Sequence, residues 1–232
     1  MNTNRILLVV LLASLSIPIF RARAADNVDG VTVKNQEVYE IQGDKLDPLT
    51  QNLKLAFDVE VSTNGTFKVG DDGKERQIQE GQVVRNDGWL LNPNGSVEPV
   101  FDHVAMKNGR VYVVRDGESS ALSKEMTFPN GMTVNPEGYG SNLPDGRIRL
   151  QDGQLFHLDG TPIQAKDTIS MKNGRVVVQK SGTLIPLSSV QIMGMDNGTR
   201  VRGDGTIWKR DGTTFQLKEG QTILVEGAKY SR

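Results

Sequence analysis

The stretch Met106–Val111 reads Met-Lys-Asn-Gly-Arg-Val, and the same six residues return at Met171–Val176. A divergent version, Lys34-Asn35-Gln36, opens an earlier unit. Each unit closes roughly 45 residues later with an acidic residue, Gly and Gln, as expected when one small structural unit is copied along a chain. The closing triplets are Glu80-Gly81-Gln82, Asp152-Gly153-Gln154 and Glu219-Gly220-Gln221. The repetition predicts three tandem domains.

The predicted domains span residues 28–91, 101–163 and 166–230, and the first is the most divergent. Residues 92–100 stand between the first and second domains as a linker or an extra hairpin. The joint between the second and third domains is much shorter. A short joint between similar units indicates limited independent motion.

Glycine placement predicts the secondary structure of each unit. Fifteen of the 25 glycines follow Asn or Asp. Asn-Gly and Asp-Gly favour the type I′ turns of tight β-hairpins. The turns recur every seven or eight residues, which leaves strands of about five residues and no room for helices of about 11–12 residues. We therefore predict an all-β protein of small antiparallel meanders. A β-solenoid is the alternative, and a trefoil-like domain is less favoured.

The hairpin around Asn108-Gly109 specifies a register. A two-residue turn places Met106 opposite Val111 and Val104 opposite Val113, so these four aliphatic side chains share one face. Ala105 opposite Tyr112 and Lys107 opposite Arg110 occupy the other face, and the basic pair should be exposed to solvent. A shift of one residue would expose the aliphatic face, so the pattern fixes the pairing.

The repeats resemble a known family. The shared order is Met-Lys-Asn-Gly-Arg-Val, a Gly then a Leu, Asn-Gly-x-x-Val, several Asp-Gly turns, and Leu-x-(Asp/Glu)-Gly-Gln. This order is similar to that of a bacterial domain of unknown function, found in tandem in exported proteins. The pattern is well matched by residues 101–163 and 166–228, whereas residues 28–91 lack the opening Met and the turn Gly. The resemblance implies a fold and export, with no activity, ligand or catalytic residue.

Residues 1–24 have the organisation of a secretory signal peptide. Arg5 precedes the apolar run Ile6–Phe20, and Ala22-Arg23-Ala24 is a small-x-small cleavage site. The run is shorter than the roughly 20 apolar residues of a membrane-spanning helix, so we expect no membrane span after leader removal. An uncleaved anchor is the alternative. The predicted localisation is exported, either periplasmic or extracellular.

The composition of the chain excludes several classes of structure and partner. The chain contains no cysteine, so neither a disulfide framework nor a lipoprotein anchor is expected. Removal of the leader takes away three arginines and no acid, which changes the formal charge from −1 to −4. An acidic mature chain argues against nucleic acid as a partner.

Neither histidine belongs to a recognisable catalytic set. Asp102-His103 could be half of a catalytic triad, but neighbours in a strand point to opposite faces. His157 lies in the strand pattern Leu155–Leu158. The chain has no Gly-x-Ser-x-Gly elbow and no cysteine nucleophile, so we assign no catalytic residue and expect no enzyme.

No cofactor or metal site is predicted. No phosphate-binding Gly-x-x-x-x-Gly-Lys-(Ser/Thr) loop occurs. The acid-rich or amide-rich loops at 70–73, 92–95 and 196–198 lack the spacing of a calcium loop, and turn formation explains their composition.

Binding is the function that the sequence leaves most open. Exported β-modules hold polysaccharides by stacking sugar rings on flat aromatic side chains. The candidate ligand-contact residues are Trp89, Tyr112 and Trp208, with Tyr139 as a further aromatic. The tryptophans do not recur at matching repeat positions, and Trp208 is more typical of a packed strand residue.

These observations favour an exported, non-catalytic repeat protein with a structural or binding role in the cell envelope or outside the cell. The candidate partners are an envelope polysaccharide or another envelope protein. A carbohydrate-binding module is one alternative, and an enzyme with an unrecognised site is the other. A concave pocket lined by polar residues from more than one unit would favour a ligand site.

Overall fold

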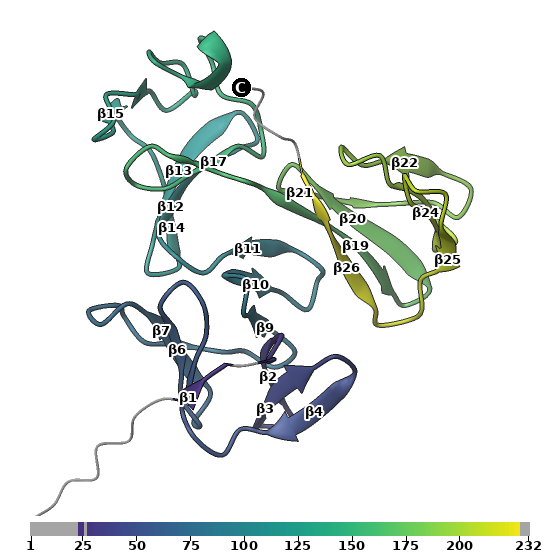
Figure 1. Ribbon diagram of the computed structural model, residues 1–232. Helices are drawn as coiled ribbons and strands as arrows, with labels where there is room; N and C mark the ends of the chain where they lie inside the picture. Colours follow the sequence, from purple (N-terminus) through teal and green to yellow (C-terminus); the bar gives the residue numbers. More distant parts are fainter. Residues whose placement is uncertain (1–22, 26, 228–232) are drawn as a thin grey trace, which may run out of the picture.

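The computed structural model describes residues 23–25 and 27–227 (Figure 1). The predicted leader lies outside the described residues except for Arg23 and Ala24. Within the described part of the chain, the regular structure consists of β-strands and one 3₁₀ turn at Pro144–Gly146. The predicted all-β class is confirmed. The described residues contain no helix that is long and apolar enough to cross a membrane.

Each repeat begins with a three-stranded meander, and a strand near the end of the repeat returns to pair with the first strand. The meanders are β2 (Gly30–Lys34), β3 (Glu37–Gln42) and β4 (Lys45–Pro48); β12 (His103–Lys107), β13 (Arg110–Arg115) and β14 (Glu118–Ala121); and β19 (Lys166–Lys172), β20 (Arg175–Lys180) and β21 (Thr183–Pro186). The returning strands are β9 (Val83–Arg85), β17 (Leu155–Phe156) and β26 (Thr222–Glu226). β10 (Trp89–Leu91) and β11 (Val97–Pro99) extend the first of these sheets, and β18 (Pro162–Ile163) extends the second.

A second, smaller sheet faces the first across the core of each repeat. In the first repeat it comprises β1 (Arg23–Ala24), β5 (Leu53–Lys54), β6 (Val59–Val61), β7 (Thr66–Val69) and β8 (Arg76–Gln77), and β1 runs parallel to β5. The second repeat has β15 (Met126–Thr127) and β16 (Thr133–Val134). The third has β22 (Ile192–Gly194), β23 (Arg200–Arg202), β24 (Thr206–Trp208) and β25 (Thr214–Gln216).

The predicted hairpin register is confirmed. Met106 lies opposite Val111 and Ala105 lies opposite Tyr112, with the matching pairs in the third repeat. Asn108 and Gly109 have φ angles of 51° and 74°, as a type I′ turn requires. Val104, Met106 and Val111 are almost fully buried in the core. Their alternation with exposed residues therefore sets the pairing.

The divergent first repeat forms the same turn without glycine. Asn35 and Gln36 have φ angles of 53° and 66°. The left-handed region disfavours residues with a Cβ atom, so Gln36 carries a conformational cost that Gly109 avoids. The carboxylate of Glu80 accepts the N–H of Asn35 at 2.9 Å and so supports the turn from outside the hairpin.

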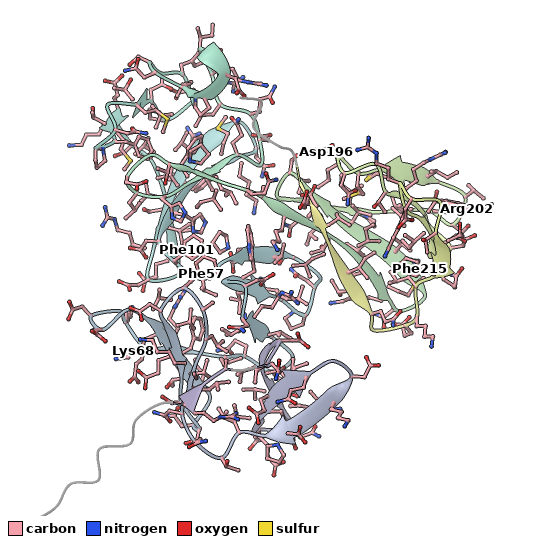
Figure 2. All side chains as sticks on the ribbon, in the orientation of Figure 1. Phe57, Lys68, Phe101, Asp196, Arg202 and Phe215 are labelled. Carbon is pink, nitrogen blue, oxygen red and sulfur yellow. The ribbon has the colours of Figure 1, made fainter. Side chains whose placement is uncertain are left out.

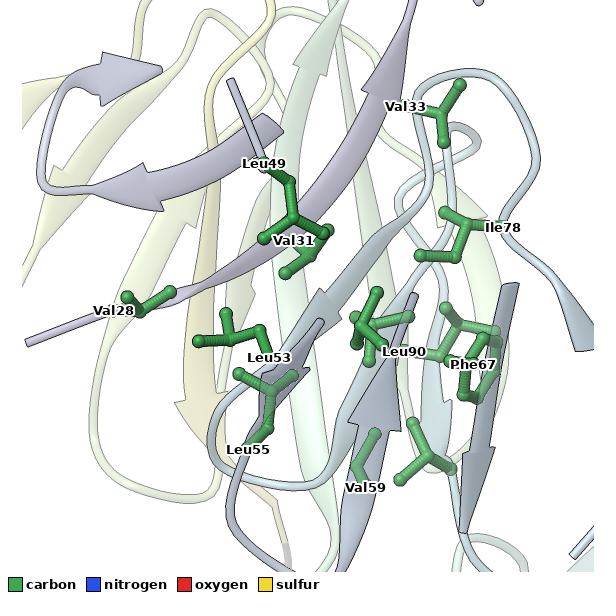
Figure 3. Packing of buried hydrophobic residues seen from close by; sticks show 13 residues of the cluster. Val28, Val31, Val33, Leu49, Leu53, Leu55, Val59, Phe67, Ile78 and Leu90 are labelled. Atoms are coloured by element: carbon green, nitrogen blue, oxygen red, sulfur yellow. The ribbon is translucent and has the colours of Figure 1, made fainter. Parts of the chain in front are cut away.

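Three separate hydrophobic cores occupy the three repeats. The largest lies between the two sheets of the first repeat, and Figure 3 shows Val31, Leu53, Phe67 and Leu90 converging there. The other cores are centred on Val104 and Phe156 in the second repeat and on Ile169 and Ile207 in the third. Because each repeat closes its own core, the sheets do not continue into a solenoid.

A fourth cluster joins the repeats. Trp89 and Val97 of the β10–β11 hairpin pack with Ile163 of the second repeat, and Leu224 of the third repeat packs against them. Phe101 stacks on Phe57 at 5.8 Å and on His157 at 5.0 Å between ring centroids (Figure 2 labels both phenylalanines). The three units therefore meet at a shared junction.

The β10–β11 hairpin, which includes all but the last residue of the segment 92–100, connects the third repeat to the first. The Gln179 side chain accepts the N–H of Val97 at 2.7 Å and donates to its carbonyl oxygen at 3.0 Å. Thr168 donates its hydroxyl to the carbonyl of Gly95. Lys166 forms an ion pair with Asp87 at 3.0 Å. These contacts cover one face of β19 and β20.

Replacement of Gln36 by Gly should stabilise the protein, because Gly adopts the positive φ of this turn without a Cβ clash. We expect the free energy of unfolding to rise by about 0.5–1 kcal/mol. This figure is the energy cost of a left-handed Gln, reduced by the extra conformational entropy of Gly in the unfolded chain. Urea denaturation measures the change. Gly109→Gln, the reverse substitution at the matching position, is the control and should be destabilising. A Gln36→Gly variant of lower stability than the wild type would contradict the strain assigned to Gln36.

Candidate functional site

A cleft of about 420 Å³ lies between the second repeat, the β10–β11 hairpin and the third repeat. Its walls carry charged and amide side chains beside aromatic and aliphatic ones. The second repeat contributes His103, Lys107, Tyr112 and Ser119; the hairpin contributes Trp89, Val97 and Glu98; and the third repeat contributes Lys166, Asp167 and Gln179. This is a pocket lined by polar residues from more than one unit.

The position of the cleft follows from how the equivalent sheet faces are used. In the third repeat, the face bearing Thr168 and Gln179 is covered by the hairpin. The equivalent face of the second repeat carries His103, Ala105 and Tyr112, which alternate with the core residues of β12 and β13. This face lines the cleft. The hairpin thus bonds directly to this sheet surface in the third repeat, whereas in the second repeat the equivalent surface forms a wall of the cleft.

Two of the three aromatic candidates meet at this cleft. Tyr112 is partly buried and Trp89 is 4% exposed, and both line it. Trp89 serves mainly as a core residue of the junction, so only a small part of its ring can meet a ligand. Trp208 lies in β24, away from the cleft, as a half-buried strand residue. Tyr139 is exposed and stacks with the Arg149 guanidinium at 5.1 Å.

His103 and Asp102 do not form a dyad. Asp102 accepts the N–H of Asp116 at 2.8 Å, whereas the His103 Nδ1 atom lies 2.9 Å from the carbonyl oxygen of Phe101. His103 is nearly fully buried, and this burial lowers its pKa, although the bond to Phe101 opposes the shift. The imidazole is therefore neutral near pH 7, with Nδ1 as the donor to the Phe101 carbonyl.

Asp167 is the most unusual ionisable residue of the cleft. Its Oδ1 atom accepts the N–H of Ser181 at 2.9 Å, and its buried Oδ2 atom has no hydrogen-bond partner in the described structure. Burial is the main cause that raises the pKa of Asp167 to about 6; the nearby Asp196 adds to the increase, and the bond from Ser181 and the charge of Lys180 oppose it. Asp29 and Asp102 accept the corresponding turn N–H groups in the other repeats. The shared role is structural, and the buried setting is particular to Asp167.

Several Asn and Asp side chains of the loops bond to their own turns. The Asn94 side chain accepts the N–H and hydroxyl of Ser96, and Asn197 accepts the N–H of Thr199. Asp159, Asp204 and Asp211 make the same bonds to the threonine two residues later, and these bonds lower the pKa of each carboxyl. Within the described residues, no group of three or more acidic or histidine side chains is placed to hold a metal ion.

Sequence reasoning missed Tyr39. It lies opposite Thr32, just as Tyr112 lies opposite Ala105, so the two tyrosines occupy equivalent positions in the first and second repeats. Val177 holds this position in the third repeat, on the face covered by the hairpin. Alignment of the three first hairpins would have shown this recurrence. Asp167 could not have been singled out, because its burial depends on the neighbouring units.

Substitution of Asp167 by Asn should stabilise the protein near neutral pH. A carboxyl group with a folded-state pKa near 6 and an unfolded pKa of about 3.9 binds its proton more tightly when folded. Its contribution to stability is therefore greatest below about pH 4 and falls as the pH rises to about 6. We expect Asp167→Asn to raise the free energy of unfolding by about 1–2 kcal/mol at pH 7, after allowance for partial solvent access, and to change it little at pH 4.

Thermal unfolding of both proteins between pH 4 and pH 8 measures this difference. Asp102→Asn, the same change at the less buried counterpart in the second repeat, is the control. A difference between wild type and Asp167→Asn that does not vary with pH would contradict the raised pKa.

Comparison with known proteins identifies one family. The model for "Domain of unknown function (DUF6799)" matches residues 28–90, 101–161 and 166–228, which together make up most of the chain. The match confirms the resemblance seen in the repeats and includes the divergent first copy. No curated protein and no solved structure matches the chain.

Proposed function

The chain belongs to the DUF6799 family, with three tandem copies of its domain, and on this premise we propose that it is an exported, non-catalytic binding protein. Its ligand site is the cleft between the second and third repeats. The observation that carries the proposal is the convergence of three parts of the chain on one cavity of about 420 Å³. A scaffold whose repeats served only as spacers would have no need for a cleft at this face of the second repeat.

Carbohydrate is the ligand class that the cleft supports best. Sugars bind where an aromatic ring offers an apolar surface and neighbouring polar groups exchange hydrogen bonds with hydroxyls. Tyr112 supplies such a ring, and Lys107, Ser119 and Glu98 supply donors and acceptors around it. The charges of both signs around the cleft favour a hydroxyl-rich ligand over a strongly anionic one.

We expect Tyr112→Ala to weaken glycan binding at least tenfold, about 1.4 kcal/mol. The measurement is a thermal-shift screen of residues 25–232 against peptidoglycan fragments and a glycan panel, followed by titration calorimetry of any hit. Trp208→Ala is the matched control, because it removes an aromatic side chain outside the cleft. Equal binding by Tyr112→Ala and wild type, with both folded, would exclude the cleft as the site.

An enzyme is the second candidate, because Asp167 and His103 line the same cleft and both have displaced pKa values. Both groups already bond to the backbone. Glycoside hydrolysis uses a pair of carboxyl groups, and Asp167 is the single buried carboxylate of the cleft, which supports binding over hydrolysis. Prolonged incubation with a bound glycan separates the two. Shortened products that Asp167→Asn no longer forms would establish the enzyme.

Export predicts that the mature protein begins at Ala25. N-terminal sequencing of the protein recovered from the periplasm or medium of a bacterial host tests this. Cleavage after Ala24 would also remove β1, leaving β5 as the edge of its sheet. Full-length protein retained in the cytoplasm would contradict export.

A further inference from the structure

Each repeat has an outer meander strand that pairs on one side only. These strands are β4, β14 and β21. Unpaired edges attract further strands, and proteins commonly protect them with proline, which has no N–H to donate. The register places Pro48, Ala121 and Pro186 at equivalent positions of the three edges. The second repeat has alanine at this position, where the other two repeats have proline.

The direction of the backbone groups shows why this position matters. The leucine after each of these residues donates its N–H inward to the neighbouring strand, as in Leu122 to Val111 at 2.9 Å. Leu49 to Val38 and Leu187 to Val176 are the equivalent bonds. Successive residues of a strand direct their backbone groups to opposite sides. The N–H of Ala121 therefore points outward to the free edge, where Pro48 and Pro186 have none.

The β14 edge is otherwise open. All four of its residues are exposed. Ser119 and Ala121 direct their N–H and C=O groups outward, and none of the bonds in the described part of the chain uses these groups. Glu118, the one charged residue of the strand, is paired with Lys74 at 2.6 Å. No charge or proline blocks the middle of the edge.

We propose that β14 pairs antiparallel with β14 of a second copy of this chain. A two-fold axis through Ser120 sets Ser119 of each copy opposite Ala121 of the other. Each such pair exchanges two backbone hydrogen bonds, so all four outward N–H groups find partners. The side chains that meet are small, and Glu118 of one copy does not lie opposite Glu118 of the other.

A second copy is the occupant that the chain itself supplies. It presents an edge of the same length and the same outward donors, whereas the other two meander edges carry proline. Ser119 also lines the cleft, so its side chain lies on the cleft face of β14. Pairing of the two strands would join the two sheets with both clefts on one face. The inference stands apart from the proposed ligand, because edge pairing needs no ligand.

Ala121→Pro tests the proposal. Proline already occupies this position in the first and third repeats, so the variant should keep its fold, as circular dichroism and the melting temperature will show. We expect the wild type to form dimers in sedimentation experiments up to roughly 100 µM, as befits a small interface. Ala121→Pro should raise the dimer dissociation constant at least tenfold. Pro186→Ala opens the matching edge of the third repeat and should increase association.

Two results would overturn this inference. One is a wild-type protein that remains monomeric throughout the concentration range. The other is a folded Ala121→Pro variant that dimerises as well as the wild type. A monomeric protein whose β14 edge instead binds an unrelated extended peptide, in a manner abolished by Ala121→Pro, would also exclude the second copy as the occupant. Failure of glycan binding would leave the dimer intact, so the two proposals are distinguishable.

Discussion

The closing acid of each repeat holds the two ends of the unit together. Glu219 accepts the N–H groups of Asn173 and Gly174 at 2.6 and 2.9 Å, and Asp152 accepts that of Gly109 at 2.9 Å. The following glycine donates to the first strand, as Gly220 does to Met171. A charged acceptor makes these bonds stronger than neutral ones. They bring the returning strand beside the first strand, which closes the core without any disulfide.

The differences between the repeats create the cleft. Three identical units would present three identical sheet faces. Here the β10–β11 hairpin covers the face of the third repeat through Gln179 and Thr168, while Tyr112 on the equivalent face of the second repeat lines the cleft. The same comparison distinguishes Ala121 from Pro48 and Pro186 at the outer edges. Candidate functional features therefore appear at positions where one repeat differs in sequence from the other two.

Local sequence patterns were sufficient to predict the secondary-structure elements, but they were not sufficient to predict the candidate site. The Asn-Gly turns and the alternation of Met106 and Val111 with polar neighbours predicted the strands and their register, because both signals act within a few residues. Tyr112 was a candidate from sequence, yet nothing local indicated that Trp89 would be buried beside it. The shifted pKa of Asp167 was equally hidden, since its counterpart Asp102 has the same local bonds.

Residue patterns alone predicted the all-β class, the three copies of the domain and the strand pairing in the first hairpins of the second and third repeats. These follow from turn chemistry and period-two burial, which neighbouring residues set between themselves. Three features came from the packing of the repeats instead: how the copies meet at Trp89, Val97 and Ile163, which sheet face lines the cleft, and which acid is desolvated. Those properties depend on contacts between residues far apart in the sequence, such as Thr168 with Gly95, 73 positions apart, and Gln179 with Val97, 82 positions apart, and no local pattern encodes them.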